Sequence, residues 1–140
     1  FSRALAVKAQ SRESVTMQPK EKVDGTKAVI TIKNYLGGNY YFTCDEIFLQ
    51  GNHAYLVEAK HAKDSPLPSL LDIKDGLVKM ILFSNIDKVE IDGKFYTPRA
   101  VLKLTVGNGR DISKLDQSSK NILEKLKKEA QVNNFEIRVS

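Results

Sequence analysis

The sequence predicts an α/β (α+β) fold in which helices flank a mixed β-sheet. Short segments rich in β-branched and aromatic residues fill residues 28–63, and such segments favour strands. Two longer segments, 70–85 and 116–133, carry apolar residues at helical spacing, and a strand-like segment follows each of them. Because strands both precede and follow a helix, the sheet should contain parallel as well as antiparallel neighbours.

The first part of the chain predicts a short helix and one strand. Residues 1–12 are expected to form the helix, and the polar residues 13–27 a loop or an irregular strand from Val15 to Gln18. Residues 28–36, with the sequence AVITIKNYL, alternate well enough for a strand. The Gly-Gly-Asn sequence that follows them predicts a turn.

The central stretch, residues 40–63, predicts a hairpin. The segments YYFTCDEIFLQ and AYLVEAKHA are strand-like, and the Gln-Gly-Asn sequence between them suits a turn. Together with the strand at 28–36, they predict a meander of three antiparallel strands. The pairing of the last two strands can bring Asp45 beside Glu58.

The second half of the chain predicts two helices and two further strands. Ser69 is the expected N-cap of a helix over residues 70–85, whose wide apolar stripe predicts that it is largely buried. Residues 86–99 are expected to form a small hairpin or loop, and residues 100–106 a strand parallel to the third strand of the meander. Asp116 is the expected cap of the second helix, and the FEIRV sequence predicts the last strand.

The composition predicts a single domain over residues 1–140 in a cytoplasmic setting. The chain is 41% hydrophobic and 28% charged, and it has no apolar run long enough for a membrane span or a signal peptide. A single cysteine excludes an internal disulfide and favours an intracellular protein, while two histidines and one cysteine give no zinc-ligand spacing. The first residue is not Met, which leaves open that the chain is a fragment, or the catalytic part, of a larger protein.

The candidate catalytic site consists of Asp45, Glu58 and Lys60. Glu58 and Lys60 are separated by one residue, so on a strand they point to the same face. Two carboxylates held on strands suit Mg²⁺, and a nearby ammonium can orient a water molecule for attack on a phosphodiester. A net charge of +5 is consistent with a polyanionic partner.

Two alternatives stay open at the level of these residues. On a regular strand Asp45 and Glu46 face opposite sides, so a bulge would exchange them as the carboxylate beside Glu58. Glu58 and Lys60 could also form only an exposed salt bridge, which contributes little to stability. The apolar residues before Glu58 instead suggest a central strand, where charges are buried only if they are paired or bind a metal.

The pattern Asp45…Glu58-Ala59-Lys60 resembles the D…(D/E)-x-K signature of the PD-(D/E)XK nucleases, the superfamily of many restriction endonucleases. The segment SLLDIKDGLVKMILFSNI, which follows it, resembles the helix after this motif in certain bacterial type II restriction enzymes. Cys44 stands where the family often has Pro. The predicted order of elements is similar to the αβββαβ core of the superfamily.

The resemblance implies a restriction-type endonuclease that hydrolyses duplex DNA with Mg²⁺, for which Mn²⁺ could substitute. It assigns Asp45 and Glu58 as metal ligands, and the carbonyl of Ala59 as a further ligand. It assigns Lys60 to orienting the attacking water and stabilising charge. The 140 residues leave little room for a recognition domain, so either loops read the bases or a separate specificity domain or subunit supplies recognition. A homodimer would explain cleavage of both strands.

His61, Lys63 and Lys74 are the expected DNA contacts. His61 directly follows Lys60, and Lys74 lies near the start of the helix at 70–85, where it could approach the phosphodiester backbone. Each of these residues also fits an ordinary solvated surface position. A DNA-binding or interaction module without chemistry, and an enzyme that cleaves RNA or nicks one strand, remain alternatives.

Overall fold

The structure of the chain is a computed structural model that describes residues 14–16, 28–33, 39–107 and 111–140. The strands within these ranges are β1 (Ser14–Thr16), β2 (Ala28–Lys33), β3 (Asn39–Cys44), β4 (Glu46–Gln50), β5 (His53–His61), β6 (Val89–Ile91), β7 (Lys94–Thr105) and β8 (Glu136–Val139). The helices are α2 (Leu70–Ser84), α3 (Gln117–Asn133) and the short 3-10 helix η1 (Ile112–Lys114).

The described strands form one mixed sheet. Their order is β3-β2-β1-β6-β7-β5-β4, and β8 also pairs with β7. β4 and β5 are antiparallel, whereas β5 and β8 both run parallel to β7. The predicted fold class, a mixed sheet with flanking helices, is therefore confirmed, and so is the parallel pairing of the strand that follows the first long helix.

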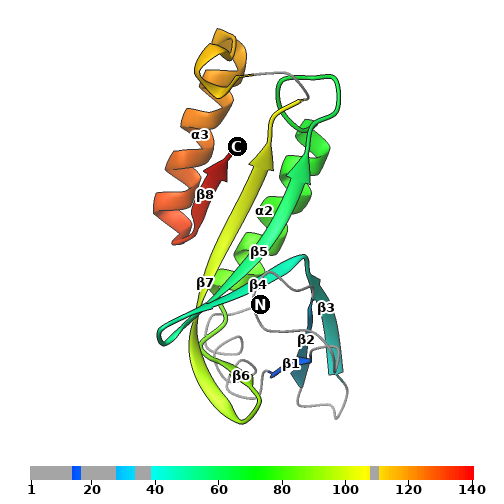
Figure 1. Ribbon diagram of the computed structural model, residues 1–140, viewed down its shortest axis with the longest axis vertical. Coiled ribbons are helices and arrows are strands. Elements are labelled where there is room, and N and C mark those ends of the chain that lie inside the picture. The colour runs from blue at the N-terminus through cyan, green and yellow to red at the C-terminus, as the bar shows by residue number, and fades with distance from the viewer. Residues whose placement is uncertain (1–13, 17–27, 34–38, 108–110) are drawn as a thin grey trace.

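β7 is the strand around which the sheet is arranged. Its residues 97–105 pair with β5 along one edge. Along the other edge β6 pairs with the start of β7, and β8 pairs with residues 101–104. Figure 1 shows β5 and β7 side by side, with α2 behind them, β1–β3 near one end, and α3 with β8 near the other. The segments predicted at 86–99 and 100–106 thus form one hairpin with a long second strand.

The prediction of one continuous strand over residues 40–50 is wrong, because the strand is interrupted at Asp45. β3 ends at Cys44 and pairs with β2, whereas β4 begins at Glu46 and pairs with β5. The Asp45 N–H donates to the Val57 carbonyl oxygen at 3.1 Å, which holds the break against β5. The hairpin of β4 and β5 is as predicted, but the meander has a divided middle strand whose side-chain alternation restarts after the break.

α2 packs on the sheet by one face only. Ser69 caps the helix as predicted, and its hydroxyl accepts a hydrogen bond from the Asp72 N–H at 3.1 Å. The prediction that the helix is largely buried is wrong, because its apolar residues extend beyond the width of the face that meets the sheet. The buried residues of the helix are Ile73, Gly76, Met80 and Phe83. The apolar side chains that are more than half exposed are Leu70, Leu71, Val78 and Ile81.

Gly76 lets α2 approach the sheet closely. A Cβ atom at this position would lie 2.6 Å from Cδ1 of Leu102, a fully buried residue of β7. We expect Gly76→Ala to lower the free energy of unfolding by about 1–2 kcal/mol, because the overlap with a packed side chain outweighs the higher helix propensity of alanine. Urea denaturation of both proteins measures this difference.

The matched control for this prediction is Leu102→Val, which shortens the side chain that the new methyl group would meet. Combined with Gly76→Ala, it should cost less stability than the sum of the two single changes. Strictly additive losses would show that this contact does not limit the approach of α2 to the sheet.

β8 pairs with the second half of β7, and α3 precedes β8 and packs on the same core. The Asp116 carboxylate accepts a hydrogen bond from the Ser119 N–H at 3.2 Å and caps α3, as predicted. Leu126 and Ala130 of α3 belong to the same apolar core as the buried residues of α2 and β7. One core therefore joins both helices to the sheet. The last predicted strand is confirmed as β8.

Part of the sequence prediction lies outside the described residues. This applies to the helix expected over 1–12 and to most of the segment 13–27, within which β1 forms a short strand. The strand expected at 28–36 is confirmed for residues 28–33 as β2. Within the part of the chain that is described, no helix has the length and apolar character needed to cross a membrane.

Candidate functional site

Asp45 lies at the break between β3 and β4, where the strand pairing changes. Its Oδ2 accepts a hydrogen bond from the Ala59 N–H at 2.9 Å. Its own N–H donates to the Val57 carbonyl oxygen at 3.1 Å. The carboxylate thus occupies the ladder position where a backbone carbonyl would otherwise accept, and these two bonds fix its direction beside β5.

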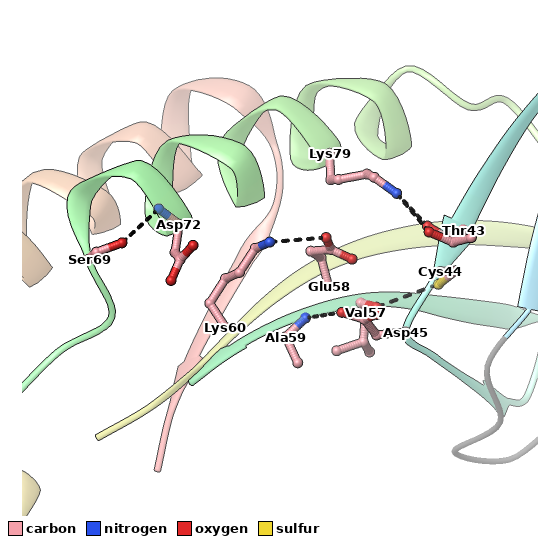
Figure 2. Close-up of polar contacts among 10 residues, drawn as sticks. All are labelled: Thr43, Cys44, Asp45, Val57, Glu58, Ala59, Lys60, Ser69, Asp72 and Lys79. Atoms are coloured by element: carbon pink, nitrogen blue, oxygen red, sulfur yellow. Dashed lines mark hydrogen bonds and ion pairs between the residues drawn. The ribbon is translucent and has the colours of Figure 1, made fainter. Parts of the chain in front are cut away.

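Glu58 projects from β5 on the face that α2 covers. Its ladder neighbour on β7 is Leu102, which meets Gly76 of α2, so Glu58 and Leu102 share that face. Glu58 is only 7% exposed, and among the described residues its Oε1 has no hydrogen-bond partner. The Lys60 Nζ lies 3.7 Å from its Oε2, which agrees with the predicted common face of these two residues. Figure 2 shows both side chains directed toward α2.

Burial raises the pKa of Glu58 above its ordinary value, and a side-chain hydrogen bond with Asp45 and the negative charge of Asp45 raise it further. The positive charges of Lys79 and Lys60 oppose this rise without cancelling it. Asp45 and Glu58 are therefore close enough for their charges to interact. A buried carboxylate with an unpartnered oxygen and a raised pKa is a group whose ionised form would be stabilised by a bound cation.

We expect the raised pKa of Glu58 to make the metal-free protein less stable at higher pH. The folded state holds this proton more tightly than the unfolded chain, so the stabilisation is complete below the ordinary pKa of 4.5 and is lost as the pH rises through the raised value. Glu58→Gln should remove this part of the pH dependence and increase the free energy of unfolding at pH 8.

Urea denaturation in EDTA between pH 4 and pH 8 measures this effect. Glu46→Gln is the control, because Glu46 forms an ion pair with Lys103 at 3.5 Å on the sheet and is partly exposed. Parallel pH profiles for the parent protein and Glu58→Gln would contradict the expectation.

Ala59 adds a backbone oxygen to the same edge of β5. The N–H and the C=O of a strand residue point to the same side of the strand. Because the Ala59 N–H points to Asp45, its carbonyl faces the edge beyond the end of β4 and away from β7. Asp45 thus adjoins both Glu58 and the backbone of Ala59, two of the predicted metal ligands.

Glu46, the rival carboxylate, lies on the other side of the sheet. Its ladder neighbour is Val57, and its Oε1 lies 3.5 Å from the Lys103 Nζ. Residues 57 and 58 face opposite sides of β5, so Glu46 is directed away from Glu58. The structure therefore brings Asp45, and not Glu46, to the candidate site.

Lys79 of α2 is a residue of this site that the sequence prediction missed. Its Nζ donates to the Thr43 carbonyl oxygen at 2.5 Å, and its charge acts on Glu58. Figure 2 shows its side chain reaching from α2 to the end of β3. One signal was present: Lys79 is the only charged residue in the run GLVKMILF, a position where a lysine needs a nearby polar partner.

Cys44 adjoins Asp45 but does not offer thiolate chemistry. Burial raises the pKa of its thiol to about 12, against the smaller opposing effect of hydrogen bonds to backbone oxygens. Its Sγ donates to the Glu46 carbonyl oxygen at 2.9 Å. A thiol that stays protonated is a poor nucleophile and a poor metal ligand, so its role here is to pack beneath the break.

The predicted DNA contacts are not brought to the carboxylates. His61 is exposed on the opposite face from Lys60, and its Nδ1 lies 3.0 Å from the Thr105 Oγ1. Lys63 and Lys74 are exposed, the first beyond the end of β5 and the second on α2. They are available to a partner at the surface around the site.

Comparisons of the chain with family models, with curated proteins and with solved structures gave no significant match.

The donor set fits Mg²⁺ better than a metal held entirely by side chains. No group of three or more His, Cys, Asp or Glu side chains able to hold a metal occurs in the described ranges. Mg²⁺ commonly binds through one or two carboxylates, keeps several waters and takes further oxygens from substrate phosphates. Asp45, the unpartnered Oε1 of Glu58 and the Ala59 carbonyl match that requirement.

Proposed function

We propose that the chain is a Mg²⁺-dependent endonuclease of restriction-enzyme type that hydrolyses phosphodiester bonds in duplex DNA. The observation that carries the proposal is the meeting of Asp45, the buried and unpartnered Glu58 Oε1, and Lys60 at one strand break. The order of β4, β5, α2 and β7 supports a PD-(D/E)XK nuclease, because Asp45 directly precedes and Glu58 lies within a hairpin that a helix joins to a parallel strand.

Mg²⁺, or Mn²⁺ in its place, would be held by Asp45, Glu58 and the Ala59 carbonyl. When bound, such a cation polarises a phosphoryl oxygen and makes a coordinated water more acidic. The hydrogen bond from the Ala59 N–H keeps the Asp45 carboxylate in place. It uses only Oδ2 of that carboxylate, which leaves Oδ1 for a metal. Burial beneath α2 excludes competing water from Glu58, which strengthens its interaction with charge.

Lys60 supplies the positive charge and proton donors beside the carboxylates. Its Nζ is 3.7 Å from Glu58 Oε2, and its side chain is 20% exposed, so it reaches both the carboxylate and the solvent side of the site. From this position it can orient an attacking water and stabilise the negative charge that develops on the phosphate.

DNA would approach from the exposed side of this edge. The net charge of +5 favours a polyanion, and Lys63, beyond the end of β5, and Lys74, on α2, are exposed cations. A homodimer, or a separate specificity subunit, would supply recognition and allow both strands to be cut.

Cleavage assays with the parent protein test this function. Supercoiled plasmid, linear duplex DNA, single-stranded DNA and RNA are incubated with Mg²⁺, with Mn²⁺ or with EDTA. Metal-dependent cleavage of duplex DNA is the expected result. Cleavage of RNA alone would assign a different substrate, and duplex binding without cleavage under any metal condition would indicate a module without chemistry.

A further inference from the structure

We propose that Lys79 is a positioning residue of the nuclease site: from α2 it holds the end of β3 and thereby the carboxylate of Asp45. The inference deepens the proposed function and rests on it for its chemical meaning. It concerns a lysine on a helix, separate from the strand lysine Lys60 that the motif contains.

The contacts of Lys79 attach α2 to the strand break. Its Nζ donates to the Thr43 carbonyl oxygen at 2.5 Å and lies 3.4 Å from the Thr43 Oγ1. Thr43 precedes Asp45 by two residues, near the end of β3. The Lys79 Nζ also lies 5.8 Å from the ring centroid of Phe83, which is 1% exposed. The carbonyl therefore binds the ammonium group, which also lies over the face of a buried ring.

The break needs such an attachment because β3 and β4 belong to different ladders. β3 pairs with β2, and β4 pairs with β5, so neither ladder alone fixes the chain at Asp45. On the β5 side, Asp45 is held by its N–H bond to Val57 and by the Ala59 N–H. Lys79 supplies a charge-assisted bond on the β3 side, and such bonds are stronger than neutral ones.

The charge of Lys79 also suits this position. The positive charges of Lys79 and Lys60 both favour the ionised form of Glu58, one from α2 and the other from β5. Figure 2 shows their ammonium groups on either side of Glu58. Two lysines thus offset the two carboxylates, and Lys79 remains engaged with the backbone while Lys60 faces the site.

Hydrogen exchange of backbone amides in the metal-free protein, followed by NMR, tests the proposal. The Ala59 N–H reports directly on Asp45, because it donates to the Asp45 Oδ2. In Lys79→Met, which keeps the stem but removes the donor, we expect the Ala59 amide to exchange at least about tenfold faster, while the Leu102 amide in β7 stays protected. Lys79→Arg should restore protection, and Lys74→Met, an exposed change on the same helix, should have no effect.

Two results would overturn the proposal. Unchanged protection of the Ala59 amide would show that Asp45 does not depend on Lys79. Equal loss at Ala59 and Leu102 would show that Lys79 contributes only to overall stability. If Lys79→Met does not fold, Lys79→Gln serves as the second variant, with the same selective loss expected. Because exchange is measured without metal or DNA, a failure of this proposal is distinct from a failure of the parent protein to cleave DNA.

Discussion

Replacing Asp45 with asparagine is expected to reduce Mg²⁺-dependent cleavage of duplex DNA at least about a hundredfold, since loss of even a group that supports a metal ligand costs about 10- to 100-fold. The substitution removes the charge while keeping an oxygen that can accept the hydrogen bond from the Ala59 N–H. Strand pairing at the break should therefore persist. Initial rates at saturating DNA over a range of Mg²⁺ concentrations measure the loss.

Glu46→Gln is the matched control for this prediction. Glu46 is the next residue along the chain, but it pairs with Lys103 away from Glu58. The control should retain parental activity within a few fold, and circular dichroism should show that both variants keep the fold. Equal loss of activity in both variants, or activity of Asp45→Asn within tenfold of the parent, would show that Asp45 is not a residue of the active site.

Replacing Lys60 with methionine is expected to lower the cleavage rate by about 10²–10³-fold, the usual effect of losing a donor that stabilises charge in a transition state. Mg²⁺ binding should persist, and removal of a cation 3.7 Å from Glu58 favours tighter binding of the metal. The loss should therefore appear in kcat at saturating Mg²⁺, and raising the metal concentration should not restore it.

Lys63→Met is the control for Lys60, because Lys63 is an exposed lysine three residues further along the chain. Lys63→Met should weaken DNA binding by the loss of about one phosphate contact. The dependence of binding on salt concentration should fall accordingly, with little change in kcat. Weaker Mg²⁺ binding in Lys60→Met, with full recovery of the rate at high Mg²⁺, would contradict the role given to Lys60.

The sequence predicted the order of the elements because its local signals agree with the tertiary structure. Ser69 and Asp116 cap the helices where capping chemistry predicted, and the turn between β4 and β5 contains Gly51 at a positive φ of 59°. The strand predicted at residues 54–62 is found as β5, and the spacing of Glu58 and Lys60 on it correctly predicted their common face. These features depend on residues close together in the chain.

The break at Asp45 could not be predicted in the same way. YYFTCDEIFLQ reads as one strand because nothing in it resembles a turn. The chain bends there because Asp45 uses its side chain and its N–H to bond residues 57 and 59, which are distant in sequence. A side chain that replaces a ladder carbonyl leaves no local signature, although the possibility of a bulge was evident.

The exposed face of α2 and the role of Lys79 were hidden for a related reason. Apolar residues on most sides of the helix predicted that it is largely buried, yet Leu71 and Val78 are 78% and 65% exposed. Lys79 could be assigned only once α2 was known to cross above the end of β3. Both depend on how far the sheet extends beneath the helix, which helical spacing alone does not determine.

Calorimetric titration with Mg²⁺, for the parent protein and Asp45→Ala side by side, tests most directly whether the carboxylates form a metal site. Repeating the titration with Ca²⁺ and duplex DNA present includes a site that DNA phosphate completes. We expect saturable binding by the parent under at least one condition, and loss of that binding in Asp45→Ala. Binding of equal strength in both proteins, or none in the parent under either condition, would contradict this expectation.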